Sequence, residues 1–250
     1  MLSCRLAESR VPMLKVECFS LPDPLQSYLV QQRQRNAPWR SLGESQHARA
    51  IKVALRNAFH DKCGYCEQIE AQTVDHFVPQ STPEMRWSWD NYLLACDVCQ
   101  SNKHDRPPFD DQGRQMVNPR HDDPIKFLYF VYETGVVTPR PDSDETLKRG
   151  QITIQLLGFS KRTRLQDERR RRLWDILGFA LRIVQPTSAA DAEDAWRHLV
   201  DHLSATAPYL GMVRQLFLTP NEYTPLVTAL RQARPEIDEA IHEWCLPIDV

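Results

Sequence analysis

Apolar side chains recur along much of this chain with the spacing of amphipathic helices. In residues 44–62, Ala50, Val53, Ala54 and Phe59 fall on or near one face, which predicts a helix that packs against a core. A short helix is also predicted over Leu25–Arg35. The last hundred residues are mostly helical in pattern, with prolines between the segments. The expected helices there cover residues 150–157, 162–184, 189–205, 208–217, 222–233 and 235–243.

Two stretches have the character of strands. Residues 125–138 place aromatic and β-branched side chains on both sides of a turn at Glu133–Gly135, which predicts a β-hairpin. A Pro/Asp/Ser loop is expected to follow over residues 139–146. Thr73–Pro79 has a second, short β pattern. The fold class is therefore α+β and predominantly α-helical.

Composition narrows the class of protein further. The chain has 250 residues, of which 42% are hydrophobic and 26% charged, and its mean hydropathy is −0.51. These values are typical of a soluble globular protein. No apolar run is long enough for a transmembrane helix, and the N-terminus lacks the apolar core of a secretory signal. We therefore expect a cytoplasmic protein without a membrane partner.

Four of the seven cysteines form two CxxC pairs, Cys63/Cys66 and Cys96/Cys99, with 29 residues between the pairs. Each pair can present two thiolates to one ion, and four thiolates complete the closed tetrahedral site of structural zinc. In a reducing cytoplasm this pattern favours metal binding over disulfides. The alternative is four unrelated buried cysteines, but two such pairs rarely arise by chance. The sequence therefore predicts a structural Zn²⁺ site.

The segment between the two pairs carries side chains that suit catalysis. Asp75 and His76 are adjacent, Asn91 follows fifteen residues after His76, and Gln100 comes nine residues after Asn91. Taken singly, these residues are ordinary: an Asp-His pair on a surface, an Asn at a helix N-cap. Their joint spacing between two CxxC pairs is what distinguishes them.

These motifs resemble the HNH endonuclease family. The matching stretches are CGYC, TVDHFVP, WDNYLLAC and CDVCQSNK, which together cover about 44 residues, 63–106. The resemblance implies a ββα-metal finger, a β-hairpin and a helix around a metal, framed by the two cysteine pairs. Together with the patterns along the chain, it predicts three parts. They are an irregular or partner-binding segment at 1–43, a nuclease domain at 44–120 and a hairpin plus helical domain at 121–250.

The resemblance also implies roles for individual residues. His76 would be the general base, because a neutral imidazole can accept a proton from water at neutral pH. Asp75 would hold a hard divalent cation, Mg²⁺ or Mn²⁺, that binds the scissile phosphate. Neighbours on a strand point to opposite faces, so a distortion or the start of a loop has to bring both side chains into use. Asn91 would orient the loop that carries the histidine.

One position departs from the family pattern. The residue after the last cysteine is usually His or Asn, the second protein ligand of the catalytic metal, whereas this chain has Gln100. Its amide oxygen can still bind a hard cation, although the side chain is one methylene longer. Asn102 is the alternative ligand if the helix begins late. Lys103 is a further candidate for the site, or part of a solvated face.

The resemblance extends, more loosely, to residues 1–180. The segments MVNPR at 116–120 and LLGF at 156–159 are similar to the HNH subunits of Septu-type anti-phage systems and of some retron systems. In that subgroup an ABC/SMC-like ATPase accompanies the nuclease. A nucleic acid, DNA in preference to RNA, is the expected substrate, although the formal net charge of −2 does not demand one.

Two further stretches permit a functional and a structural interpretation. Residues 161–175 hold seven basic and three acidic side chains. They could neutralise phosphates, or form a solvated or partner-binding helix face. His121, Asp122 and Asp123 could hold a metal, but a turn or helix cap is the better interpretation.

Three functions therefore remain open at the level of sequence. The first is a metal-dependent nuclease that acts in defence. The alternatives are a catalytically weak or inactive zinc-knuckle module that binds nucleic acid or an ATPase, and a zinc-stabilised protein–protein adaptor. The adjacent Asp75 and His76 favour the first, whereas Gln100 and the nearly neutral net charge leave room for the others.

Overall fold

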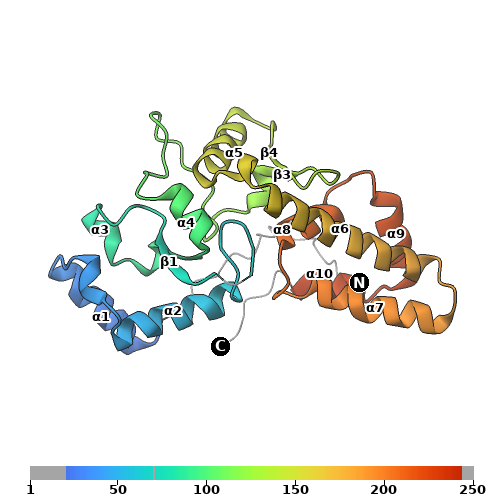
Figure 1. Cartoon of the computed structure of the whole chain (residues 1–250), viewed down its shortest axis with the longest axis horizontal. Coiled ribbons are helices and arrows are strands. Elements are labelled where there is room, and N and C mark those ends of the chain that lie inside the picture. The colour runs from blue at the N-terminus through green and yellow to red at the C-terminus, as the bar shows by residue number, and fades with distance from the viewer. Residues whose placement is uncertain (1–20, 70, 244–250) are drawn as a thin grey trace, which may run out of the picture.

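The computed structural model describes residues 21–69 and 71–243. The chain forms two lobes joined by a short hairpin and a helix (Figure 1). One lobe contains α1 to α4 with the strands β1 and β2, and the other contains α6 to α10. Between them lie the hairpin β3–β4 and helix α5. The buried apolar side chains form one continuous core through all of these parts. The predicted α+β, mainly helical class is confirmed.

The first lobe has the expected ββα core. Strands β1 (Thr73–His76) and β2 (Tyr92–Ala95) pair antiparallel, and α4 (Asp97–Lys103) follows two residues after β2. The amphipathic helix predicted over residues 44–62 is α2 (Gln46–Phe59). The predicted packing face was wrong in part: Ala50 and Val53 are exposed, because Ile51, Leu55 and Ala58 form the buried stripe with Phe59. It begins where the Ser45 side chain accepts a hydrogen bond from the Ala48 amide, an N-cap of the usual kind. The short helix α3 (Pro83–Arg86) lies in the loop between the strands.

The described part of the segment expected to be irregular packs on this lobe. Helix α1 (Asp23–Gln34) corresponds to the short helix predicted over residues 25–35. Its Tyr28 ring stacks on His47 of α2, with 3.7 Å between the ring centroids. The indole of Trp87 donates a hydrogen bond of 2.8 Å to the Ala37 carbonyl and is fully buried. Residues 21–42 are therefore part of the lobe, whereas residues 1–20 of the expected 1–43 segment lie outside the described residues.

The predicted hairpin is present as β3 (Leu128–Phe130) and β4 (Val137–Pro139). Gly135 in its turn has a φ of 68°, and a Cβ there would lie 2.0 Å from the Gln166 carbonyl oxygen, so only glycine fits. The loop predicted over residues 139–146 is shorter in the structure. Helix α5 (Asp144–Leu157) begins inside it, because Ser143 and Thr146 form a reciprocal capping box. The helix predicted to start at residue 150 therefore starts six residues earlier.

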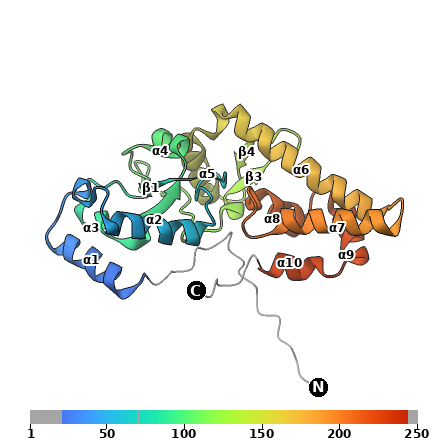
Figure 2. The ribbon, with the colours of Figure 1, turned by 60° about the horizontal axis from the view of Figure 1, so that its bottom comes forward.

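The second lobe consists of the predicted C-terminal helices. They are α6 (Thr163–Val184), α7 (Ala189–Leu203), α8 (Leu210–Leu218), α9 (Thr224–Ala233) and α10 (Ile237–Glu243). Helix α6 packs along α7 and α9 (Figure 2). Residues 210–217 of α8 are all buried, and Gln215 bonds both the amide and the carbonyl of Phe130 in β3. No described helix combines the length and apolar character required to cross a membrane.

Candidate metal centre and active site

The four CxxC cysteines converge on one point. Their sulfur atoms all lie within 4.8 Å of one another, and the Sγ atoms of Cys66 and Cys96 are 3.7 Å apart. A tetrahedron with Zn–S bonds of about 2.3 Å has edges of about 3.8 Å. The donor set and its spacing therefore fit a tetrathiolate zinc site. Among the described residues it is the only group of three or more potential His, Cys, Asp or Glu ligands.

Local backbone structure shapes the first cysteine pair. The Gly64 amide donates to the Leu94 carbonyl of β2 at 2.8 Å, which fixes the pair to the sheet. A Cβ at Gly64 would lie 2.8 Å from the Phe59 ring, so a larger residue would push against the end of α2. The turn closes with the Glu67 amide bonded to the Cys63 carbonyl at 2.8 Å. In the second pair Cys96 is the N-cap of α4 and Cys99 lies in its first turn.

A cavity of about 280 Å³, lined by residues of β1 and α4 among others, contains most of the predicted catalytic residues. Asp75, His76 and Gln100 line it together, although Asp75 and His76 are neighbours in sequence. Strand β1 ends at His76. The regular alternation of side chains therefore stops there, and two adjacent residues can line the same cavity. The remaining lining residues are Trp39, Val74, Gln80, Ser101, His104 and Asp105.

Asp75 is buried and held by two donors. The Tyr65 hydroxyl donates to its Oδ2 at 2.5 Å, and the Lys103 Nζ lies 3.2 Å from the same oxygen. Burial raises the pKa of Asp75, while Lys103 and the Tyr65 hydrogen bond act in the opposite direction. Lys103 is itself fully buried and donates to the His76 carbonyl at 2.6 Å. It therefore links the backbone of one predicted catalytic residue to the carboxylate of the other.

His76 has a fixed ring orientation. Its Nε2 lies 3.0 Å from the Arg86 carbonyl oxygen, which can only accept, so Nε2 carries the proton in the neutral ring. The Nδ1 atom is then the free base. Edge-to-face contacts with Trp39 and Tyr92, at centroid distances of 4.4 and 5.1 Å, hold the ring on two sides. Burial lowers the pKa of His76 to about 4, which keeps the imidazole neutral at neutral pH.

Asn91 lies outside the cavity and clamps the loop that follows β1. Its Oδ1 accepts from the Val78 amide at 2.7 Å, and its Nδ2 donates to the Val78 carbonyl at 2.8 Å and the Met85 carbonyl at 3.0 Å. The side chain is buried, so these bonds are not exposed to competition from water.

The two candidate amides on α4 point to different places. Helix α4 begins at Asp97, so Gln100 lies in its first turn and faces the cavity. Its Nε2 donates to the Val74 carbonyl at 3.3 Å, which leaves the amide oxygen as the available end. Asn102 instead donates to the Leu157 carbonyl at 2.9 Å, against Gly158 at the end of α5. It lines a separate cavity of about 520 Å³ and is not placed to share a ligand set with Asp75.

Sequence reasoning did not single out three residues that the structure places at these sites. They are Tyr65, which bonds Asp75; Trp39, which packs on His76; and Arg162, whose Nη1 donates to the Cys99 sulfur at 3.0 Å. Tyr65 lies inside the CGYC motif, so its position in the sequence could have identified it as a residue near the site. Trp39 and Arg162 are distant from the motifs in sequence, so only the fold reveals them.

The two ambiguous stretches have structural roles in the described chain. Asp122 accepts from the Asn118 amide and pairs with Arg149, and Asp123 pairs with the buried Arg214 at 3.3 Å. This agrees with the turn interpretation rather than a metal cluster. In the basic stretch 161–175, Arg169 is buried while Arg170 is exposed and pairs with Asp167. At least one basic residue of this stretch is therefore part of the core and not available to a nucleic acid.

Comparison with known proteins agrees with this geometry. Residues 62–106, which include both cysteine pairs, β1, β2 and α4, match the HNH endonuclease family. The chain therefore contains an HNH endonuclease domain.

The chain is also homologous to Septu protein PtuB. It is 27% identical to Septu protein PtuB of Bacillus mycoides (strain KBAB4) over 159 residues, which cover 51% of this chain and 52% of that protein. It is 32% identical to Septu protein PtuB of Bacillus thuringiensis over 84 residues, which cover 31% of this chain and 32% of that protein. The aligned region thus spans about half or less of these curated relatives.

Proposed function

We propose that this protein is a metal-dependent HNH endonuclease that hydrolyses phosphodiester bonds of nucleic acid. The observation that carries the proposal is the cavity in which Asp75, His76 and Gln100 meet, in a domain that also contains a four-cysteine cluster. The HNH match of residues 62–106 covers this same region.

The residues of the cavity suit the steps of hydrolysis. The free Nδ1 of His76 accepts a proton from the attacking water, and the Arg86 carbonyl holds the ring in the tautomer that makes this possible. Asn91 keeps the loop between Val78 and Met85 in place, and that loop leads to the Arg86 carbonyl. Lys103 fixes the main chain of His76 relative to the Asp75 carboxylate.

The oxygen donors of the cavity fit a hard divalent cation. Asp75 offers a carboxylate and Gln100 an amide oxygen, the ligand types that Mg²⁺ and Mn²⁺ prefer. Only two protein ligands leave positions open for water and a phosphate oxygen. A cation bound there would stabilise the negative charge that develops on the scissile phosphate and the leaving 3′-oxygen.

Cleavage of nucleic acid by the purified chain tests this function. Supercoiled plasmid and structured RNA are incubated with the protein in Mg²⁺, in Mn²⁺ and in EDTA. We expect metal-dependent nicking, with DNA cut in preference to RNA. If neither substrate is cut in either metal, alone or with the partner described below, the chain is a binding module or adaptor instead.

Replacing Gln100 tests its place as metal ligand. Gln100→Asn keeps the amide oxygen and is expected to retain or raise activity. Gln100→Leu removes it and should lower the cleavage rate by about 10–100-fold, comparable to losses of metal-site partners. Cleavage rates per zinc-loaded protein are measured over a Mg²⁺ titration. Full activity of Gln100→Leu, together with loss in Asn102→Leu, would assign the role to Asn102.

We further propose that the protein acts in anti-phage defence with an ABC/SMC-like ATPase. Support comes from the likeness to the two Septu proteins and from the surface of α6. Trp174 and Leu181 lie seven residues apart, on one face of the helix, and are 56% and 49% exposed. Large exposed apolar groups of this kind are typical of protein-binding surfaces. Leu210 and Phe217, two large apolar residues of the neighbouring helix α8, are buried and do not contribute to this surface.

Co-expression tests the partner. The chain and an ATPase encoded beside it are expected to elute together in size-exclusion chromatography. Trp174→Ser should weaken the complex, because it removes an exposed aromatic anchor. Val53→Ser is the matched control, since Val53 is also 56% exposed but lies on α2. Separate elution, together with full-rate cleavage by the isolated chain, contradicts the docking proposal and leaves the nuclease proposal standing.

A further inference from the structure

Arg162 breaks a local rule of helix formation. It is the N-cap of the 22-residue helix α6, where a positive charge opposes the helix dipole, and it makes no capping hydrogen bond. Its guanidinium instead reaches into the other lobe. Nη1 donates to the Cys99 sulfur at 3.0 Å, and Nη2 donates to the Gln68 side chain at 3.3 Å. The position is therefore explained by the cysteine cluster and not by the helix.

Arg169 is the second anomaly on the same helix. It lies two turns after Arg162, within the buried stripe formed by Leu165 and Leu173, and is only 3% exposed. Its guanidinium carbon lies 5.3 Å from the ring centres of both Phe130 and Phe159. Its Nε and Nη1 atoms are buried without a hydrogen-bond partner in the described structure. A buried cation in such surroundings is costly unless negative charge lies nearby.

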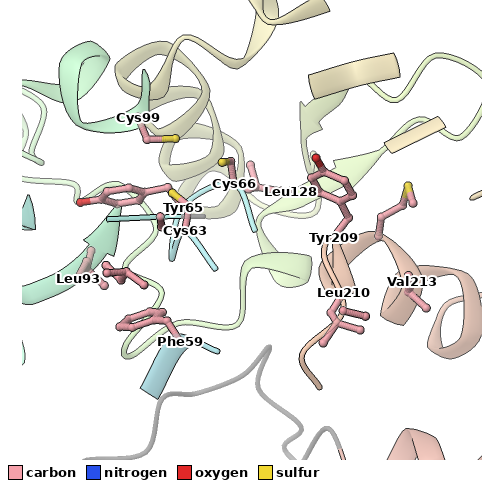
Figure 3. Close-up of a cluster of buried hydrophobic side chains, with 14 of the residues drawn as sticks. Phe59, Cys63, Tyr65, Cys66, Leu93, Cys99, Leu128, Tyr209, Leu210 and Val213 are labelled. Carbon is pink, nitrogen blue, oxygen red and sulfur yellow. The ribbon is translucent and has the colours of Figure 1, made fainter. Parts of the chain in front are cut away.

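The cysteine cluster is a source of that charge. Four thiolates around one Zn²⁺ carry two net negative charges. Figure 3 draws three of the cysteines in one buried cluster with Tyr209, whose ring also lies 6.0 Å from the Arg169 guanidinium. Burial lowers the pKa of Arg169, and the charge of Cys66 is the largest influence that opposes this.

We propose that Arg162 and Arg169 are the counter-charges of the zinc tetrathiolate, and that zinc loading thereby controls how firmly α6 is attached to the nuclease lobe. This inference rests on the zinc assignment. The two guanidinium groups match the two net negative charges of the metal site, and the nearby Lys62 and Glu67 add one charge of each sign. Loss of the metal would leave the cations without a fixed partner in a buried place.

Other bonds show that the same junction joins the lobes. Glu67, the residue after the first cysteine pair, accepts a hydrogen bond of 2.9 Å through its carboxylate from the Gly211 amide at the start of α8. Lys62, the residue before Cys63, donates to the Ala205 and Ala207 carbonyls at 2.5 and 3.1 Å. The cysteine cluster and the residues next to it therefore contact the segments at the starts of α6 and α8. A change in the charge of the cluster changes the electrostatic energy of these contacts.

Zinc release from the full-length chain tests the proposal. The variants are Arg162→Met and Arg169→Met, with Arg170→Met as matched control, because Arg170 is exposed on the same helix. Transfer of zinc to the dye 4-(2-pyridylazo)resorcinol is followed by absorbance. We expect Arg162→Met to release zinc on the order of 10-fold faster than the wild type, as for loss of a charged hydrogen bond. Arg170→Met should behave as the wild type.

Thermal unfolding supplies a second readout that distinguishes charge from packing. The unfolding midpoint is measured with zinc and after its removal by EDTA. In Arg169→Met the difference between the two midpoints should be smaller than in the wild type, because the metal-free variant no longer buries an uncompensated cation. A merely structural role would lower both midpoints equally.

Specific outcomes would overturn the proposal. Release rates of both Met variants equal to that of Arg170→Met, or an unchanged midpoint difference in Arg169→Met, contradict it. If the Met variants do not fold, Arg162→Lys and Arg162→Gln are compared: slower release from the Lys variant supports the charge role, and equal rates contradict it. A wild-type protein purified without zinc would instead refute the zinc assignment itself.

Discussion

Replacing His76 by alanine is expected to lower the cleavage rate by about 10²–10⁴-fold, the usual cost of losing a general base. The reason is that His76 lines a cavity together with Asp75, and its bond to the Arg86 carbonyl sets the tautomer that leaves Nδ1 free to accept a proton. Zinc content and far-UV circular dichroism should remain those of the wild type. The measurement is the initial rate of plasmid nicking at saturating Mg²⁺.

His121→Ala is the matched control for this experiment. His121 is exposed, and within residues 21–69 and 71–243 its one hydrogen bond runs from its backbone amide to the Asn118 carbonyl, so its loss should leave the rate unchanged. Wild-type cleavage by His76→Ala on the true substrate would show the proposed mechanism to be wrong. Asp75→Ala should behave differently from His76→Ala. It weakens metal binding, so raised Mg²⁺ or Mn²⁺ should recover part of its activity.

Substitution of a cluster cysteine is expected to destabilise the fold rather than impair catalysis alone. One zinc per chain is predicted, held by Cys63, Cys66, Cys96 and Cys99, whose sulfurs lie within 4.8 Å of one another. Because the binding energy of a structural zinc site is folding energy, Cys63→Ser and Cys99→Ser should give insoluble or protease-sensitive protein. Solubility, limited proteolysis and elemental analysis measure these effects.

Cys18→Ser controls for the loss of a thiol as such, because Cys18 belongs to neither CxxC pair. It should remain soluble and keep its zinc. Protein purified without chelator that contains no zinc by elemental analysis is incompatible with the prediction. So is a Cys99→Ser protein with wild-type solubility and protease resistance.

The finger was predictable because its signals are local. Each CxxC pair makes its own turn, and the spacing from His76 to Asn91 and from Asn91 to Gln100 lies within one motif of about 44 residues. The helices after residue 160 were predictable for a similar reason, since apolar periodicity and prolines mark them. Their observed bounds differ from the predicted ones by at most two residues. The start of α5 was missed because its capping box lies in a stretch of Pro, Asp and Ser that has the composition of a loop.

The sequence by itself determined the class of the protein and its motif: two cysteine pairs, an Asp-His pair and an Asn at fixed spacing, because those residue types carry their chemistry in any fold that brings them together. The tertiary structure alone decided which side chains surround that motif. Trp39 and Arg162 lie 37 residues before His76 and 63 residues after Cys99 in the chain, yet each contacts its partner directly. It also placed Gln100 in the cavity of Asp75 and Asn102 in another, because two positions on one helix turn point to opposite sides. Contacts of this kind depend on how elements distant in sequence pack, and that is set by the whole core rather than by any local pattern.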